Sequence, residues 1–175
     1  MRVIAGELGG RRLRAPRSDA VRPTADRVRE SLFSILGDVG GLRVLDLYCG
    51  TGSLGIEAIS RGASAATFVD LDTRAAERNV ADLGIGERAT LVRSDVPRFL
   101  GREGGSYDLV LCDPPYRLAR RLGPELDRLL PPFLSGGARV IVETAAEDAV
   151  ELSLALIDDR VYGSSRIRIH RREER

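Results

Sequence analysis

Apolar residues recur with two different periods along this chain, and each period predicts a different kind of element. Val28, Leu32 and Leu36 lie on one stripe of a helix predicted over about residues 25–37, which Thr24 can cap and Gly37 can end. Beyond this helix, short apolar runs alternate with stretches of helical periodicity. The runs lie at residues 42–47, 65–69, 89–92, 109–112 and 138–142, and the helical stretches near residues 53–61, 73–83, 95–101 and 118–130. Apolar strands alternating with helices predict an α/β fold with a parallel sheet covered on both faces.

The two ends of the chain follow another pattern. Residues 2–5 and 11–14 are short extended segments around Gly9-Gly10, which predicts a β-hairpin. Near the other end, residues 156–162 and 166–170 flank a Gly-Ser-Ser turn, which predicts an antiparallel hairpin at the edge of the sheet. We therefore expect an N-terminal β-hairpin extension over residues 1–20 and one main domain over residues 21–175.

Composition excludes several classes of protein. The chain has 175 residues, of which 43% are hydrophobic and 30% charged, as expected for one soluble domain. No apolar run is long enough to cross a bilayer or to serve as a signal peptide, so we expect a cytoplasmic protein without a membrane partner. The only cysteines, Cys49 and Cys112, cannot form a disulfide framework or a cysteine-built zinc site, and we expect no metal.

Charge becomes informative once it is divided along the chain. The net charge is +1, but both ends are rich in arginine and the middle is acidic. Basic ends on an acidic body favour an anionic partner, most simply a nucleic acid. The chain contains no lysine, so a solvated surface with biased arginine usage is the alternative interpretation.

A glycine-rich loop follows the first strand of the predicted sheet. Gly50, Gly52 and Gly55 match G-x-G-x-x-G between a strand and a helix, where the backbone can approach a nucleotide closely. Asp70 follows the next strand, 20 residues after Gly50, and suits the hydroxyls of a ribose. This pattern fits either a dinucleotide or S-adenosylmethionine. Asp46 favours the second, because an acid suits a cationic amino group better than a pyrophosphate.

The sequence Asp-Pro-Pro-Tyr at residues 113–116 is the most specific signal in the chain. It follows a predicted strand, and parallel sheets bind ligands at the carboxyl ends of their strands. The two prolines fix the backbone, so Asp113 and the Pro114 carbonyl can both hold an exocyclic amine for methylation. Tyr116 can stack on a base rotated out of its helix. After the third strand, Asp95 can accept the amine of an adenine, cap the next helix, or do both. For residues 113–116 the alternative is a rigid structural turn.

Several motifs together resemble the bacterial small-subunit rRNA guanine-N2 methyltransferases, which modify guanine 966 of 16S rRNA. The resemblance runs through VIAG and GRRL near the N-terminus, RPTADRVRESLF at residues 22–33, LDLYCGTGSLGIEA at residues 45–58, and RVYG at residues 160–163. The segment at residues 22–33 is the most specific of these. Cys49 stands where the family usually has alanine.

The resemblance implies a Rossmann-like S-adenosylmethionine-dependent methyltransferase fold with a seven-stranded, mostly parallel sheet whose last strand is antiparallel. The residues expected to bind the cofactor are Asp46, Tyr48, Gly50, Thr51, Gly52, Asp70, Leu71, Asp95 and Val96. The residues expected at the reacting amine are Asp113, Pro114, Pro115 and Tyr116. The residues expected to bind RNA are Arg2, Arg11, Arg12, Arg14, Arg22 and Arg27, where Arg22, Thr24 and Arg27 can face either the cofactor or the RNA. The expected partner is 16S rRNA in the small ribosomal subunit or an assembly intermediate, met by a monomer.

Two other classes of function remain open at this stage. An NAD-dependent oxidoreductase would use the glycine loop and Asp70 but would leave Asp46 and residues 113–116 unexplained. A catalytically idle RNA-binding assembly factor would keep the basic ends without the intact cleft motifs. Among methyltransferases, another rRNA or DNA base is also an alternative acceptor. We expect Cys49 and Cys112 to be free thiols near the cleft, and His170 to lie on the surface or at the RNA face.

Overall fold

The computed structural model describes residues 1–14, 26–102 and 104–174. The helices are α1 (Asp26–Leu36), α2 (Ser53–Ser60), α3 (Arg74–Leu83), α4 (Val96–Leu100) and α5 (Ala119–Leu129), with short 3-10 turns η1 (Gly86–Arg88), η2 (Tyr116–Leu118) and η3 (Pro131–Phe133). The strands are β1 (Arg43–Leu47), β2 (Ala65–Asp70), β3 (Ala89–Arg93), β4 (Tyr107–Cys112), β5 (Leu134–Ala145), β6 (Ala155–Tyr162) and β7 (Ser165–Arg171). Each strand and helix predicted for the described residues from 26 onward is present, with ends shifted by up to a few residues. Thr24, the predicted cap of α1, lies outside the described residues.

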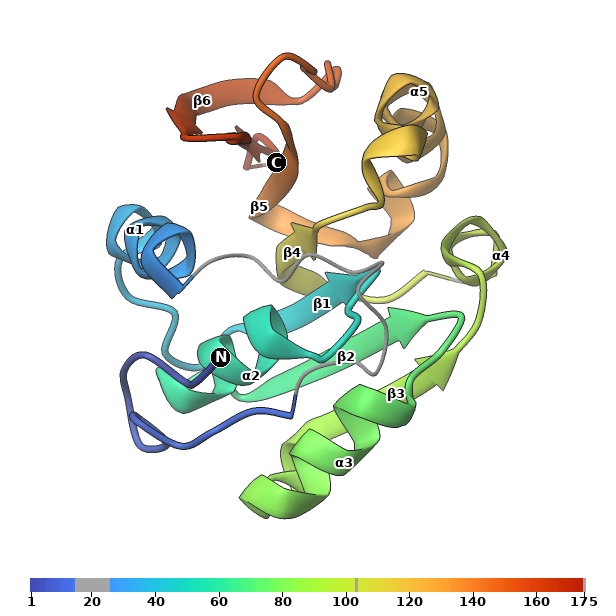
Figure 1. Ribbon diagram of the computed structural model, residues 1–175. Helices are drawn as coiled ribbons and strands as arrows, with labels where there is room; N and C mark the ends of the chain where they lie inside the picture. The colour runs from blue at the N-terminus through green and yellow to red at the C-terminus, as the bar shows by residue number, and fades with distance from the viewer. Residues whose placement is uncertain (15–25, 103, 175) are drawn as a thin grey trace.

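All seven strands form one sheet in the order β3-β2-β1-β4-β5-β7-β6 (Figure 1). β1 pairs in parallel with β2 and β4, while β7 runs antiparallel to both β5 and β6. β7 is therefore the single reversed strand of the sheet. The hairpin predicted at the end of the chain is confirmed, and it extends the sheet at the β5 side.

Two apolar cores cover the two faces of the sheet. Neighbouring residues of β1 point to opposite faces, so Val44 joins the core beneath α1, α2 and α3, and Leu45 joins the core beneath α4 and α5. Both residues are fully buried. This two-sided burial explains why the central strands read as continuous apolar runs. β6 differs because it is an edge strand, and Leu156, Ile157 and Val161 remain exposed there.

The N-terminal segment, residues 1–14, lies against α2 and α3 (dark blue in Figure 1). Arg2 and Arg12 form an isolated antiparallel bridge, so the predicted pairing is present without regular strands. The reason is that the N–H groups of Ile4 and Ala5 donate to the carboxylate of Glu57 on α2, at 2.7 and 3.1 Å, instead of extending a ladder. Val3 and Leu13 belong to the core beneath α1–α3, which fixes the segment to the main body.

His170 is buried, with 1% of its surface exposed, so the expectation of a surface or RNA-facing histidine is wrong. β7 lies between β5 and β6, and His170 pairs with Val140 on one side and Leu156 on the other. Burial lowers the pKa of the imidazole, since desolvation disfavours its charged form. The prediction failed because the arginines around His170 resembled an exposed strand, whereas the strand is internal.

Candidate active site

The glycine loop makes a tight turn between β1 and α2. Tyr48, Gly50 and Gly52 all have positive φ, at 59°, 54° and 77°. The Gly52 N–H donates to the Cys49 carbonyl at 2.7 Å, and Gly52 stands at the N-cap position of the buried helix α2. A Cβ at Gly55 would lie 2.4 Å from the ring of Phe68 on β2, so this glycine allows α2 to pack directly on the sheet. The predicted fingerprint therefore has a distinct structural reason at each glycine.

Two carboxylates accept hydrogen bonds from the backbone of this loop and of the helix that follows it. Asp70, at the end of β2, accepts a hydrogen bond from the Gly50 N–H at 2.9 Å. Asp46, on β1, accepts one from the Gly55 N–H at 2.9 Å and is only 1% exposed. Burial raises the pKa of Asp46 to about 7, and the hydrogen bond from Gly55 opposes this rise. The predicted contacts of Asp70 with a ribose and of Asp46 with an amino group stay predictions, and both residues also hold the loop itself through these hydrogen bonds.

The Asp-Pro-Pro-Tyr turn lies beside the glycine loop because β1 and β4 are neighbours. Leu47 pairs with Cys112, so the residues that follow each strand leave the same edge of the sheet side by side. Asp113 is partly buried and Pro114 is buried, whereas Pro115 is exposed. The Pro115 carbonyl accepts a hydrogen bond from the Leu118 N–H at 2.8 Å, and Tyr116 begins the short turn η2. The structure thus brings together two motifs whose first residues, Gly50 and Asp113, are 63 positions apart in the sequence.

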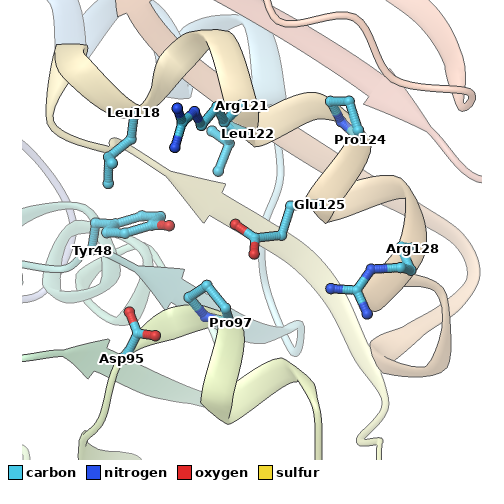
Figure 2. Close-up of a pocket in the computed structure, with 9 residues that line it drawn as sticks. All are labelled: Tyr48, Asp95, Pro97, Leu118, Arg121, Leu122, Pro124, Glu125 and Arg128. Carbon is cyan, nitrogen blue, oxygen red and sulfur yellow. The ribbon is translucent and has the colours of Figure 1, made fainter.

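A cavity of about 560 Å³ lies at this edge of the sheet, between α4 and α5 (Figure 2). Its lining residues are Tyr48, Asp95, Pro97, Leu118, Arg121, Leu122, Pro124, Glu125 and Arg128. Asp95 stands at the N-cap position of α4 as predicted, but its carboxylate makes no capping hydrogen bond with the described residues. Figure 2 shows the Asp95 carboxylate beside the ring of Tyr48, on the wall opposite Glu125. Asp95 is thereby free of the capping role and available to a ligand.

The remaining residues predicted for the cofactor surround this edge of the sheet. Leu71 follows Asp70 and is 67% exposed, which is unusual for a large apolar side chain in this protein. Thr51 and Val96 are buried, in the glycine loop and at the start of α4. Burial raises the pKa of the Tyr48 hydroxyl, and nearby carboxylates add to the effect. The contacts of these four residues with a cofactor stay predictions.

Cys49 and Cys112 are free cysteines, as expected. Both are buried, one in the glycine loop and one at the end of β4. Burial raises the pKa of both thiols, so the unreactive thiol form is favoured. Their neighbourhood therefore does not resemble that of a reactive cysteine.

The arginines predicted to bind RNA fall into different situations. Arg14 forms an ion pair with Asp82 of α3 at 2.6 Å, and Arg11 donates to the Asp82 carbonyl at 3.1 Å. Arg2 lies 3.9 Å from Asp26. Arg12 and Arg27 are exposed. Arg22, together with Thr24, lies outside the described residues.

Three buried polar residues of this region were not predicted from the sequence. The Asn79 amide on α3 donates to the Thr51 carbonyl at 2.9 Å and accepts from the Arg14 N–H at 2.8 Å, so it joins the glycine loop to the N-terminal segment. The side chains of Arg29 and Glu57 are fully buried, and 3.8 Å separates Arg29 Nε from Glu57 Oε2. A signal for Arg29 existed, because it lies three and seven residues before Leu32 and Leu36, on the buried stripe of α1.

The described part of the chain contains no cluster of three or more His, Cys, Asp or Glu side chains that could hold a metal ion. Each helix among the described residues is too short or too polar to cross a membrane.

Comparison with known proteins relates these features to a family. The sequence matches the family model described as conserved hypothetical protein 95 over residues 1–171. The chain belongs to this family. A relative from Escherichia coli strain K12, Ribosomal RNA small subunit methyltransferase D, is 36% identical over 182 residues, covering 99% of this chain and 90% of the relative.

Solved structures of other proteins resemble this chain in three dimensions as well. The putative methyltransferase yhhF from Escherichia coli is 35% identical and superposes with a TM-score of 0.87, covering 100% of this chain and 99% of the other. An RNA methyltransferase from Salinibacter ruber in complex with S-adenosyl-L-homocysteine is 17% identical, with a TM-score of 0.66 over 88% of this chain and 95% of the other. The chain thus has the Rossmann-like fold of S-adenosylmethionine-dependent methyltransferases, as expected from the sequence.

Proposed function

We propose that this chain transfers a methyl group from S-adenosylmethionine to the exocyclic N2 of a guanine in 16S rRNA, with guanine 966 as the target that the family resemblance implies. It acts as a cytoplasmic monomer on the small ribosomal subunit or an assembly intermediate. The observation that carries the proposal is the pairing of Leu47 with Cys112, which sets the glycine loop beside the Asp-Pro-Pro-Tyr turn. The name of the relative from Escherichia coli supports rRNA as the substrate class.

The loop and its surroundings fit this cofactor. Gly50 and Gly52 have positive φ and no side chain, so a ligand can approach the backbone at the end of β1. The Asp70 carboxylate can accept further hydrogen bonds beside the one from the Gly50 N–H. When bound, S-adenosylmethionine supplies an electrophilic methyl group that needs no metal. The Asp95 carboxylate and the exposed Leu71 side chain can contact an adenine from its edge and its face.

The chain's own residues prepare the acceptor. A guanine N2 is a poor nucleophile because its lone pair is delocalised into the ring. Hydrogen bonds from this amine to the Asp113 carboxylate and the Pro114 carbonyl favour a tetrahedral nitrogen with its lone pair directed at the methyl group. Pre-organisation of this kind lowers a barrier by several kcal/mol, with a ceiling of roughly 7–11 kcal/mol. Asp113 can then take the proton that the methylated nitrogen loses, and Tyr116 holds the base by stacking.

The decisive experiment measures transfer of labelled methyl groups to small subunits from cells that lack the modification, beside naked 16S rRNA and DNA. Reverse-transcription stops then locate the product. Label on one guanine of the particle supports the enzyme, the donor and the target together. Cofactor binding without transfer to any substrate would favour the idle assembly factor instead.

We predict that Asp113→Ala abolishes transfer and leaves the affinity for S-adenosylhomocysteine near that of the wild type, because Asp113 orients the acceptor amine. Asp108→Ala is the matched control, since Asp108 lies on β4, the strand that Asp113 follows, and its carboxylate accepts the Arg43 N–H at 2.9 Å, away from the cleft. Single-turnover transfer and calorimetric binding provide the two readouts. Turnover of Asp113→Ala close to that of the control would contradict the mechanism.

A further inference from the structure

The arginines of this chain differ in whether a partner already holds them. Some exposed arginines are engaged inside the protein by carboxylates, as in Arg74 with Asp72 at 2.6 Å, Arg160 with Asp158 at 3.0 Å and Arg171 with Glu174 at 3.1 Å. Near the C-terminal end, Asp159 also pairs with both Arg166 and Arg168. Such arginines contribute little net attraction for an outside anion, because a carboxylate already neutralises each of them.

A group of exposed arginines on α4, η2 and α5 has no such carboxylate partner. Arg98 lies on α4, Arg117 on η2, and Arg121 and Arg128 on α5. All four are exposed, and none forms an ion pair or a hydrogen bond within the described part of the chain. Glu125 is one helical turn from both Arg121 and Arg128, a spacing at which ion pairs commonly form, yet none forms here. We call these four residues the α4–α5 arginine surface.

This surface adjoins the candidate active site. Arg121 and Arg128 line the same cavity as Tyr48 and Asp95, and Figure 2 shows both arginines on its α5 wall. Arg117 follows the Asp-Pro-Pro-Tyr turn directly. Arg121 and Arg128 are separated by seven residues, about two turns or 10 Å along a helix, so they can meet successive phosphates on one strand. Within the cavity, Asp95 and Glu125 balance the charges of Arg121 and Arg128, so the excess positive charge of the surface comes from Arg98 and Arg117.

We infer that the α4–α5 arginine surface holds the phosphate backbone of the substrate RNA next to the cleft. The inference rests on the proposed function for the identity of the partner. In this inference, arginines on α4, η2 and α5 bind RNA phosphates. The RNA-binding arginines predicted from the sequence all lie within the first 27 residues. Arg11 and Arg14 are held by Asp82 in the free protein, so an RNA that used them would first have to displace those contacts.

The test compares two double variants that each remove two positive charges. Arg121→Gln/Arg128→Gln changes the proposed surface, and Arg160→Gln/Arg171→Gln changes two arginines whose side chains are each 53% exposed but paired. The affinity for naked 16S rRNA is measured at several salt concentrations. Each lost phosphate contact lowers the slope of log affinity against log salt by about one. We expect the first variant to lose about two from this slope and at least tenfold in affinity, and the control to stay near the wild type.

Methyl transfer separates this inference from the proposed function. The first variant should raise KM for RNA. Because Arg121 and Arg128 line the cavity together with Tyr48 and Asp95, the affinity for S-adenosylhomocysteine is measured in parallel, and a variant that loses this affinity while keeping the wild-type salt slope would overturn the inference. Equal salt slopes in the two double variants would overturn the inference, even if the wild type methylates guanine. Weaker binding to assembled subunits with unchanged binding to naked rRNA would also overturn it, because the surface would then contact a protein. A wild type that binds RNA with the expected slopes but transfers no methyl group would refute the proposed function alone.

Discussion

Asp46 supports the glycine loop from a fully buried position, and this position has an electrostatic cost. Its carboxylate accepts the Gly55 N–H, but burial raises its pKa from 3.8 to about 7. The folded protein therefore keeps this proton up to about pH 7, while the unfolded chain releases it near pH 4. The free energy of unfolding consequently falls as the pH rises through this window. Above pH 7 the Asp46 carboxylate is ionised in the folded protein, and its burial destabilises the fold unless a cation lies close to it.

We predict that Asp46→Asn removes this pH dependence. Asparagine keeps an oxygen that can accept the Gly55 N–H but carries no charge. In the absence of ligand, the variant should gain stability relative to the wild type between pH 5 and pH 8, by about 1.4 kcal/mol for each unit by which the pKa is raised within that interval. Urea unfolding at both pH values measures this difference. Parallel pH profiles for the two proteins would show that Asp46 does not titrate in this range.

The glycine fingerprint and the Asp-Pro-Pro-Tyr turn could be recognised at the residue scale because their spacing is local. Asn79, Arg29 and Glu57 could not be assigned in this way. Arg29 and Glu57 each have one partner a helical turn away, but the contacts that join Arg29 to Glu57, Asn79 to the glycine loop and Glu57 to the N-terminal segment span 28 or more residues of sequence. A lone polar residue in an apolar stripe indicates burial but not the partner that makes the burial tolerable. These residues were therefore found only once the elements were packed.

The N-terminal segment shows how one element depends on a single close contact. Gly6 and Gly10 both have a φ of 82°, a conformation that costs a side chain about 1–2 kcal/mol. Their surroundings differ, because a Cβ at Gly6 would lie 1.8 Å from the Ser60 carbonyl oxygen, while a Cβ at Gly10 would meet nothing within 4 Å. Next to Gly6, the Glu7 N–H donates a hydrogen bond of 2.8 Å to the same Ser60 carbonyl, at the end of α2.

We predict that Gly6→Ala destabilises the protein by about 1–3 kcal/mol more than Gly10→Ala, because only the first must displace backbone from α2. Thermal unfolding of the two variants gives the comparison, and Gly10→Ala serves as the control for the cost of the positive φ. Equal losses in the two variants would mean that the segment does not dock on α2 as described.

The same element marks a limit of sequence-based prediction. Two extended segments around glycines indicate a hairpin, and the antiparallel bridge between Arg2 and Arg12 agrees with it. Backbone hydrogen bonds join the two segments at Val3, Gly10 and Leu13. The N–H groups of Ile4 and Ala5, however, donate to Glu57, 53 and 52 residues away. The strands of the sheet were predicted well because their burial on both faces leaves a direct apolar signal. A segment held by polar contacts to a distant helix leaves no such signal.

At the scale of the whole molecule, charge is arranged differently in space than along the chain. The basic ends suggested where an anionic partner binds, but Asp159 alone forms ion pairs with both Arg166 and Arg168, at 2.7 and 3.0 Å. These arginines hold the pKa of Asp159 at about 2, well below its usual value. The positive charge available to a partner is therefore set by which arginines lack a carboxylate, and counting charges along the sequence could not show this.

The choice between the two cofactor classes is also a property of the whole fold, because a ligand bound across the glycine loop, Asp70 and Asp95 ties three strand ends together. We predict that S-adenosylhomocysteine raises the unfolding temperature and that NAD does not. At a ligand concentration of 100 Kd, binding adds about 2.7 kcal/mol, which corresponds to roughly 5–10 °C for a protein of this size. Asp70→Asn serves as the control for site-specific binding, and it should reduce the shift without lowering the unfolding temperature of the free protein by a similar amount. We expect no shift with NAD because its pyrophosphate would lie near Asp46, which is buried and partly charged at neutral pH. A larger shift with NAD than with S-adenosylhomocysteine would reverse the assignment.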